Sequence, residues 1–166
     1  MTVDFKIRAM TYDDVDAVTA IEKLVFTDPW PKSAFRDMLE ISNRVNLLLV
    51  APDGELVGYI FAQIVADELQ VQNIAVAPPY RRQRLGSLLL GKAEEEGIAR
   101  GALCSVLDVR ATNEAALRLY QSFGYRMIGR RKNYYRRPVC DALVLFRRLD
   151  QPEADVAGEP NNGMVS

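Results

Sequence analysis

The central segment of the chain, residues 69–109, reads LQVQNIAVAPPYRRQRLGSLLLGKAEEEGIARGALCSVLDV. Its two ends, residues 69–76 and 103–109, are rich in Val, Ile and Leu and predict β-strands. Between them, residues 85–100 carry leucines on one side and three consecutive glutamates on the other, which is typical of an amphipathic helix that ends at Gly101. A strand, a helix and a strand in this order predict a crossover that lays the two strands side by side.

Further strands and helices flank this crossover. Apolar residues at helical spacing predict helices at 15–26, 31–41 and 113–123. Apolar runs and alternation predict strands at 5–8, 45–50, 56–65, 125–131 and 142–148. Thr11 and Asp14 resemble a capping box before the first helix, and Asn113 is expected to cap the last one. Because strands and helices are mixed along the chain, the expected fold class is α/β with a mixed sheet.

The composition bounds the chemistry before any motif is considered. The chain has 166 residues, of which 49% are apolar, and this suits one domain with a sizeable core. It contains no histidine, which excludes Ser-His and Cys-His dyads and imidazole zinc sites. Proton transfer must therefore use carboxylates, tyrosine, thiol, amine or water, and we expect no metal.

Two further features bear on localisation. Cys104 and Cys140 form no C-x-x-C pair, and nothing indicates a disulfide framework. No apolar run approaches about 18 residues, and the first residues lack the basic region of a signal peptide. We expect a soluble protein of the reducing cytoplasm that does not bind membranes.

Charge is unevenly distributed along the chain. Residues 150–166 contain four acids and no Lys or Arg, and we expect this acidic tail to be disordered. Residues 1–149, the expected domain, carry 21 basic and 18 acidic side chains, a net charge of +3. Eight of the basic residues lie between Arg126 and Arg148. Such local positive charge attracts phosphates or acidic chains, but the domain is not basic enough to predict nucleic acid as a partner.

A basic loop precedes the helix at 85–100. It reads Tyr80-Arg81-Arg82-Gln83-Arg84-Leu85-Gly86-Ser87. A helix start presents unpaired N–H groups and the positive end of the helix dipole, which together favour a pyrophosphate. The loop lacks the Walker A and G-x-G-x-x-G patterns, so neither ATP nor NAD is expected. The alternative is a solvated surface without a ligand.

A second group of polar residues follows the strand at 103–109. Asp108 lies near the end of this strand, Asn113 begins the next helix and Tyr120 lies within it. The crossover brings all three near the expected phosphate ligand, where they can serve acid–base chemistry. On spacing alone, the alternative of a surface acid, a helix cap and a core aromatic is favoured.

Taken in order, these motifs resemble those of the GNAT acetyltransferases. The resemblance rests on Asn73-Ile74-Ala75-Val76, the loop at 80–86, Asp108-Val109-Arg110-Ala111-Thr112-Asn113, Leu119-Tyr120 and Phe123-Gly124-Tyr125. Pro29-Trp30 and Asn133-Tyr134-Tyr135 are similar to features of the RimI branch, the ribosomal-protein-alanine N-acetyltransferases. The resemblance covers residues 5–149. It implies the GNAT fold, a mixed and mostly antiparallel sheet with two splayed parallel strands and flanking helices.

The resemblance also implies acetyl-CoA as co-substrate. Backbone groups at 74–76 would hold its pantetheine arm, and those of the basic loop would hold its pyrophosphate. The implied acetyl-CoA-binding residues are Ile74, Ala75, Val76, Arg81, Arg82, Gln83, Arg84, Leu85, Gly86, Ser87, Asn113 and Tyr120. The family has glycine where this chain has Arg84. Glycine there permits either a tight backbone approach or a positive φ, so a side chain is expected to strain the loop. Alternatively, Arg84 reaches the phosphates from outside.

For catalysis, the resemblance implies Asp108 as the base and Tyr120 as the proton donor to the departing CoA thiolate. The N–H of Val76 would stabilise the oxyanion. RimI proteins usually carry Glu at the position of Asp108. The shorter side chain puts direct reach to the amine in doubt and favours a bridging water.

The implied reaction acetylates the N-terminal α-amine of a protein, and the implied partner is a ribosomal protein that begins with Ala or Ser. The implied acceptor-binding residues are Trp30, Tyr134, Tyr135 and Arg131. Alternatively, Trp30 is a core anchor and the arginine is solvated. Three other functions remain open: transfer to a lysine side chain or small amine, acyl-CoA binding without catalysis, and nucleic-acid binding.

Overall fold

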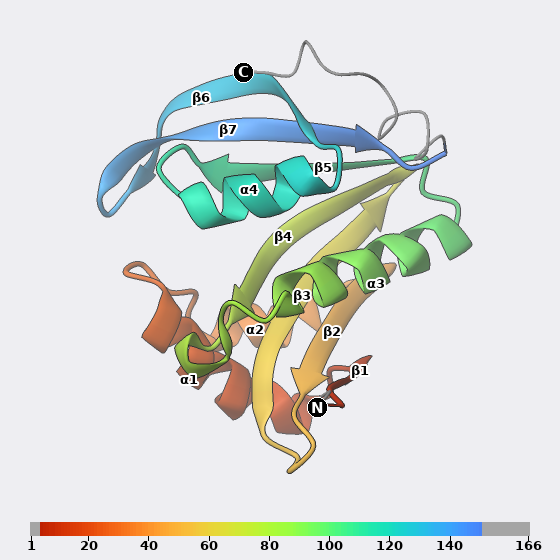
Figure 1. Cartoon of the computed structure of the whole chain (residues 1–166), viewed down its shortest axis with the longest axis vertical. Coiled ribbons are helices and arrows are strands. Elements are labelled where there is room, and N and C mark those ends of the chain that lie inside the picture. The colour runs from red at the N-terminus through yellow and green to blue at the C-terminus, as the bar shows by residue number, and fades with distance from the viewer. Residues whose placement is uncertain (1–3, 151–166) are drawn as a thin grey trace.

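The segment 69–109 folds into the expected strand, helix and strand: β4 (Glu68–Val76), α3 (Leu85–Ala99) and β5 (Cys104–Arg110). In the computed structural model, which describes residues 4–150, β4 and β5 are parallel neighbours. Helix α3, which connects them along the chain, crosses one face of the sheet over β4 and the next two strands on the side away from β5 (Figure 1). The crossover predicted from the sequence is therefore confirmed. Of the predicted tail 150–166, all but the first residue lies outside the described residues.

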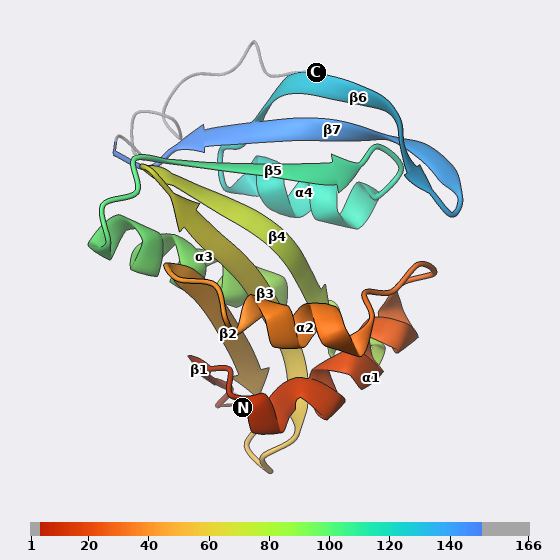
Figure 2. The same ribbon diagram turned by 180° about the vertical axis from the view of Figure 1, so that it is seen from behind.

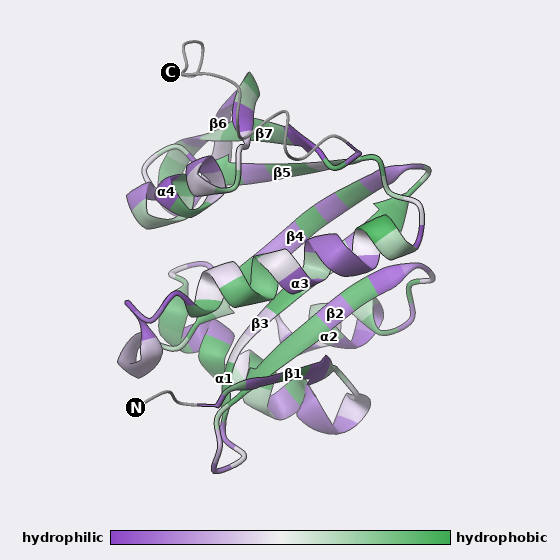
Figure 3. Ribbon diagram, turned by 45° about the vertical axis from the view of Figure 1, so that its right-hand side comes forward, coloured by the Kyte–Doolittle hydropathy of each residue, from purple (hydrophilic) through white to green (hydrophobic). Residues whose placement is uncertain are grey.

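The other strands complete a seven-stranded sheet in the order β1-β2-β3-β4-β5-β7-β6. They are β1 (Lys6–Ala9), β2 (Arg44–Val50), β3 (Leu56–Val65), β6 (Arg126–Arg136) and β7 (Val139–Arg148). Every neighbouring pair except β4–β5 is antiparallel. The predicted α/β class with a mixed, mostly antiparallel sheet is confirmed. Figure 3 shows β2 hydrophobic over most of its length, whereas the edge strand β1 is mainly hydrophilic.

Helices cover both faces of the sheet. The helices α1 (Val15–Val25) and α2 (Lys32–Met38) lie on one face, and α3 and α4 (Glu114–Ser122) lie on the other (Figures 1 and 2). Strand β3 serves two cores, because Tyr59 and Phe61 pack under α1 and α2 while Ile60 and Ala62 pack under α3. A strand that is buried on both faces is mostly apolar, as the run at 56–65 is apart from Gln63.

Both predicted helix caps form. The backbone N–H of Thr11 donates to Asp14 at 2.8 Å, and a single 3-10 turn, Tyr12–Asp14, leads into α1. Arg8 on β1 donates to both oxygens of the same carboxylate and holds the pKa of Asp14 at about 2. The side chain of Asn113 accepts the N–H of Ala116 at 3.1 Å and caps α4. Local residues therefore fix where these helices begin.

Strands β4 and β5 separate after a short paired stretch. Within the described chain they pair from Glu68–Val71 against Cys104–Leu107 alone. On the other side of β4, Phe61 faces Asn73 and Ala62 faces Val71, so Gln72 is an extra residue in the ladder with β3. Such a bulge bends the strand that carries it. Beyond Gln72, β4 and β5 diverge toward the side of the sheet where α1 ends and α4 begins (Figures 1 and 2).

Three element boundaries differ from the prediction by more than one residue. Strand β6 continues to Arg136, whereas the prediction ended it at 131. Strand β7 begins at Val139, whereas the prediction began it at 142. A register shift between Arg131 and Tyr135, with Asn133 at φ 51°, interrupts the alternation and hides this part of the hairpin in the sequence. Helix α2 ends at Met38 and not at 41, and the following residues form turns.

A buried polar cluster joins α3 to the C-terminal strands. The carboxylate of Glu94 on α3 accepts the hydroxyl of Tyr125 at 2.7 Å and the guanidinium of Arg147 on β7. The Tyr125 hydroxyl also lies 2.7 Å from Ser105 Oγ on β5. Burial raises the pKa of Glu94, so the carboxylate depends on these donors. The cluster therefore connects α3, which packs on β2, β3 and β4, with strands β5 and β7.

Replacing Tyr125 by Phe should therefore destabilise the protein. The change leaves the buried Glu94 with one donor fewer, which costs about 2 kcal/mol for a hydrogen bond to a charged group. Urea unfolding of Tyr125→Phe would measure the loss. Tyr12→Phe, at a side chain that is 55% exposed, is the control and should change the free energy of unfolding by less than about 0.5 kcal/mol. Equal values for the two variants would contradict the assigned role of the cluster.

Candidate functional site

A cavity of about 310 Å³ lies where β4 and β5 diverge. Residues of α1 and the segment after it form one wall, the bulged part of β4 forms the floor, and β5 and α4 form the opposite wall. The lining residues are Glu22, Phe26, Thr27, Asp28, Trp30, Val71, Gln72, Asn73, Ile74, Asp108, Val109, Arg110, Asn113, Ala116, Tyr120 and Tyr135.

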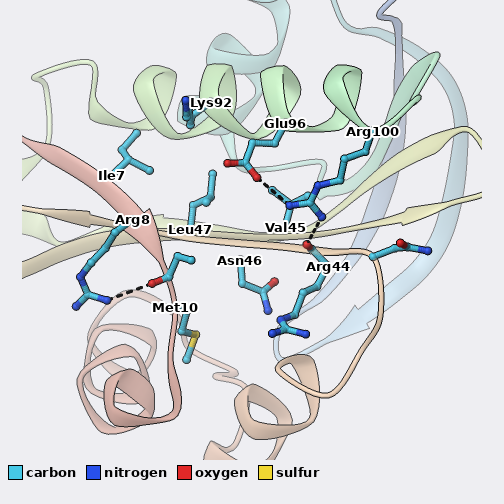
Figure 4. Close-up of a pocket in the computed structure, with 12 residues that line it drawn as sticks. Ile7, Arg8, Met10, Arg44, Val45, Asn46, Leu47, Lys92, Glu96 and Arg100 are labelled. Carbon is cyan, nitrogen blue, oxygen red and sulfur yellow. Dashed lines mark hydrogen bonds and ion pairs between the residues drawn. The ribbon is translucent and has the colours of Figure 1, made fainter.

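A larger groove of about 520 Å³ lies at the sheet edge between β1, β2 and α3. Its charged side chains are spread along the groove and do not converge on one point, as Figure 4 shows. Arg100 donates to Glu96 and to the Arg44 carbonyl, and Arg8 donates to Asp14. None of the predicted site residues lines this groove. The cavity between the splayed strands is therefore the candidate functional site.

Asp108 lies on β5 just beyond the last residue paired with β4. On its other side it faces Val144 of β7, which fixes its position in the sheet. Its carboxylate is 29% exposed, and the Arg131 guanidinium approaches Oδ1 at 3.4 Å. The structure thus places an accessible carboxylate in the wall of the cavity, with Arg131 beside it although Arg131 does not itself line the cavity.

Tyr120 combines the two interpretations left open by the sequence. Its side chain is 3% exposed and belongs to the core beneath α4, yet it also lines the cavity. Burial raises the pKa of the Tyr120 hydroxyl well above its usual range. The phenol therefore stays protonated at neutral pH and can act as a hydrogen-bond or proton donor.

Tyr135 and Arg110 form the entrance on the β6–β7 side. The Arg110 guanidinium lies 4.3 Å from the ring centroid of Tyr135 and donates to the carbonyl of Pro138 at 3.1 Å. Burial, together with the charge of Asp108, raises the pKa of Tyr135 to about 12. Tyr134, by contrast, is 51% exposed, packs edge-on against Tyr135 and lies outside the cavity lining.

The backbone of β4 presents donors toward the gap. The N–H of Ala77 donates to Val57 on β3, and successive N–H groups alternate between the two edges of a strand. The N–H of Val76 therefore points away from β3, toward the side where β5 has separated. The Val76 carbonyl accepts from Arg81 Nε at 3.2 Å on the same side. Ile74 lines the cavity, whereas Ala75 and Val76 lie beyond it toward the basic loop.

The basic loop takes the conformation that its glycine-like position requires. Arg84 has φ 60° and ψ 27° and is the N-cap of α3, and Arg82 has φ 66°. Such left-handed conformations are costly for side chains other than glycine, which agrees with the strain expected at Arg84. Arg84 makes no side-chain hydrogen bond to the first turn. Residues 81–87 lie outside the lining of the 310 Å³ cavity and surround the start of α3.

Several cavity residues escaped the sequence analysis, and Glu22 is the most deeply buried of them at 1% exposure. Its position four residues after Val18, on the apolar side of α1, is the one signal that could have revealed it. Asn73, Gln72 and Asp28 also line the cavity. Among residues 4–150 no group of His, Cys, Asp or Glu side chains is arranged to hold a metal ion. No helix in this part of the chain is long and apolar enough to cross a membrane.

Comparison with known proteins agrees with this geometry. The acetyltransferase (GNAT) family profile matches residues 15–125. A putative ribosomal protein bS18-alanine N-acetyltransferase of Bacillus subtilis is 38% identical over 145 residues, 87% of this chain and 96% of the relative. The Mycobacterium tuberculosis N-alpha-acetyltransferase RimI is 34% identical over 92% of this chain and 99% of its own length.

Solved structures show the same fold. The crystal structure of the Escherichia coli ribosomal-protein-S18-alanine N-acetyltransferase superimposes with a TM-score of 0.82 at 31% identity, covering 96% of this chain and 99% of that one. The structure of Ard1 from Thermoplasma volcanium gives a TM-score of 0.81 at 23% identity, covering 87% and 97% of the two chains. With the family profile and these relatives in agreement, the chain belongs to the GNAT acetyltransferase family.

Proposed function

We propose that the protein transfers the acetyl group of acetyl-CoA to the N-terminal α-amine of a protein, with a ribosomal protein that begins with Ala or Ser as its acceptor. Support comes from the RimI-type relatives, whose names specify alanine N-acetylation of ribosomal protein bS18. The observation that carries the proposal is the cavity itself, which brings an accessible carboxylate, a buried phenol and the free edge of β4 together.

The charge of the cavity suits an amine acceptor. Three carboxylates line it, Glu22, Asp28 and Asp108, and Arg110 is the cationic side chain among the lining residues. An N-terminal amine has a pKa of about 7.7–8.0 and arrives largely protonated at neutral pH. The acidic lining attracts this cation, and the amine must then lose its proton before it can attack.

The proposed mechanism uses Asp108 and Tyr120, which line the cavity, and the backbone N–H of Val76, which lies beyond it on β4. The Asp108 carboxylate takes the proton of the amine, directly or through one water. The amine nitrogen then attacks the thioester carbon, and the Val76 N–H stabilises the oxyanion. When the tetrahedral intermediate collapses, the C–S bond breaks and CoA leaves as the thiolate. Tyr120 donates a proton to the thiolate sulfur and regains one, through water, from the nitrogen, which must lose its second proton to become the acetylated amide.

Acetyl-CoA would lie along β4 and reach the start of α3. Residues 74–76 would pair with the pantetheine arm, and the N–H groups of residues 82–87 would bind the pyrophosphate at the positive end of the α3 dipole. Asn113 and Tyr120 would contact the acetyl-CoA from α4. The acetyl thioester would then point into the cavity beside Asp108.

The acceptor would enter between two segments that are already joined. The hydroxyl of Thr27, after α1, donates to the carbonyl of Arg137 in the β6–β7 turn at 3.0 Å. Trp30 and Tyr135 line the cavity near these two segments, whereas Tyr134 and Arg131 lie outside its lining. Aromatic side chains here would favour a chain end with a small first residue. Cys104 and Cys140 are free thiols, which is in keeping with action in the cytoplasm.

A peptide panel tests this proposal. Acetyl-CoA-dependent thiol release is measured with peptides that begin with Ala, Ser, Met or Glu, and with an N-blocked peptide that contains an internal lysine. We expect turnover with the free Ala and Ser peptides and background rates with the blocked one. Turnover of the blocked peptide would reassign the protein as a lysine acetyltransferase.

Replacing Asp108 by Asn tests the base. We expect kcat for the Ala peptide to fall by about 100-fold, because general-base catalysis contributes at least this much, while acetyl-CoA affinity stays within about twofold. Asp108→Glu keeps the charge and restores the longer side chain usual in the RimI branch, so it should retain or exceed the wild-type rate. An unchanged kcat in Asp108→Asn would remove Asp108 from the mechanism.

A further inference from the structure

The carboxylate of Glu22 is buried and lines the cavity, but it takes no part in the proton transfers described above. Three donors from three different segments converge on it. Oε1 accepts the Asn73 side-chain amide at 2.8 Å and the Tyr59 hydroxyl, and Oε2 accepts the backbone N–H of Trp30 at 2.9 Å. An ionised carboxylate that is fully hydrogen-bonded can remain in the interior. Glu22 therefore connects α1 with β3, β4 and the segment before α2.

This arrangement fixes which way the Asn73 amide faces. A carboxylate can only accept hydrogen bonds, so Asn73 must turn its NH₂ group toward Glu22. Its carbonyl oxygen Oδ1 is then the group that Asn73 offers to the cavity that it lines. Burial raises the pKa of Tyr59 far above its usual range, so its hydroxyl stays protonated. Like the Asn73 amide, it therefore donates its hydrogen bond to Glu22.

Asn73 and Asp108 line the same cavity from two different strands. Asn73 follows the bulged Gln72, directly beyond the part of β4 that pairs with β5, and precedes Ile74. Asp108 lines the opposite wall. A carbonyl oxygen on the floor and a carboxylate on the wall can each accept one N–H of the same amine. The nitrogen lone pair is then left to face the thioester on β4.

We propose that Glu22 is a positioning residue that holds the Asn73 amide so that Oδ1 accepts an N–H of the acceptor amine. This inference rests on the proposed function, because it deepens the description of the same acceptor site. The second oxygen of Glu22 accepts the backbone N–H of Trp30 and so holds another residue of the cavity wall. The ring centroid of Trp30 lies 5.4 Å from that of Phe35 and 6.3 Å from that of Phe61.

The test substitutes Glu22→Gln and measures the acceptor peptide and acetyl-CoA separately. If the side-chain oxygen of the introduced glutamine still accepts the Trp30 N–H, the NH₂ group of that glutamine faces Asn73. The Asn73 amide must then flip, so that its oxygen accepts from the glutamine and its NH₂ group faces the cavity. A donor then meets the donor groups of the amine. We expect the KM of the Ala peptide to rise about tenfold, the loss of one good hydrogen bond, while the affinity for acetyl-CoA stays within twofold. Asn73→Ala should raise the KM equally, and the double variant should be no worse than Asn73→Ala.

Glu94→Gln is the matched control. Glu94 is also a buried carboxylate that accepts a tyrosine hydroxyl, but it lies in the cluster with Arg147 and outside the cavity. This variant should lower the melting temperature and leave the peptide KM within twofold. A peptide KM within twofold of wild type in Glu22→Gln would overturn the proposal. A KM rise of the same size in Glu94→Gln would also overturn it, because the effect would then reflect general loosening.

Calorimetric binding of the Ala peptide to the CoA-loaded protein separates this inference from the proposed function. If the wild-type protein binds the peptide without acetylating it, the proposed function fails. Weaker binding by Glu22→Gln would still support the positioning role. Equal binding by the wild type and Glu22→Gln would overturn the positioning role even if transfer to the peptide were efficient.

Discussion

The structure depends on the loss of pairing between β4 and β5. Four residues of each strand are paired, and the bulge at Gln72 then bends β4 away. Backbone N–H and C=O groups in the interior of a sheet are normally hydrogen-bonded to the neighbouring strands. The divergence therefore leaves the edge of β4 available to a ligand. It also opens the cavity into which Asp108 and Tyr120 project from the opposite side.

Two buried carboxylates stabilise the fold on either side of this divergence. Glu94 joins α3 to β5, β7 and Tyr125, where the strands still meet. Glu22 joins α1 to Tyr59, Asn73 and Trp30, where β4 has separated. Both carboxylates accept hydrogen bonds from distant segments, and such buried networks favour one arrangement of the elements around them. The first supports the sheet as a whole, and the second borders the acceptor side of the cavity.

Much of the fold could be predicted because its signals are local. The crossover at 69–109 and the Asn113 cap depend on neighbouring residues, and the structure confirms both. The bulge at Gln72 could not be predicted, since it is defined by the pairing of β4 with β3. Glu22 was missed for a similar reason. Its donors lie 8, 37 and 51 residues away, and a glutamate in a helix is typical of a solvated surface.

The account is tested most directly by a crystal structure with a bisubstrate ligand, in which CoA is linked through an acetyl group to the amine of an alanine-initiated peptide. We predict that the pyrophosphate lies at the start of α3 and the acetyl group beside the Val76 N–H. The former amine nitrogen should lie within hydrogen-bonding distance of Asn73 Oδ1 and reach Asp108 directly or through one water. A peptide bound in the groove between β1, β2 and α3, or an amine nitrogen remote from Asp108, would contradict the account.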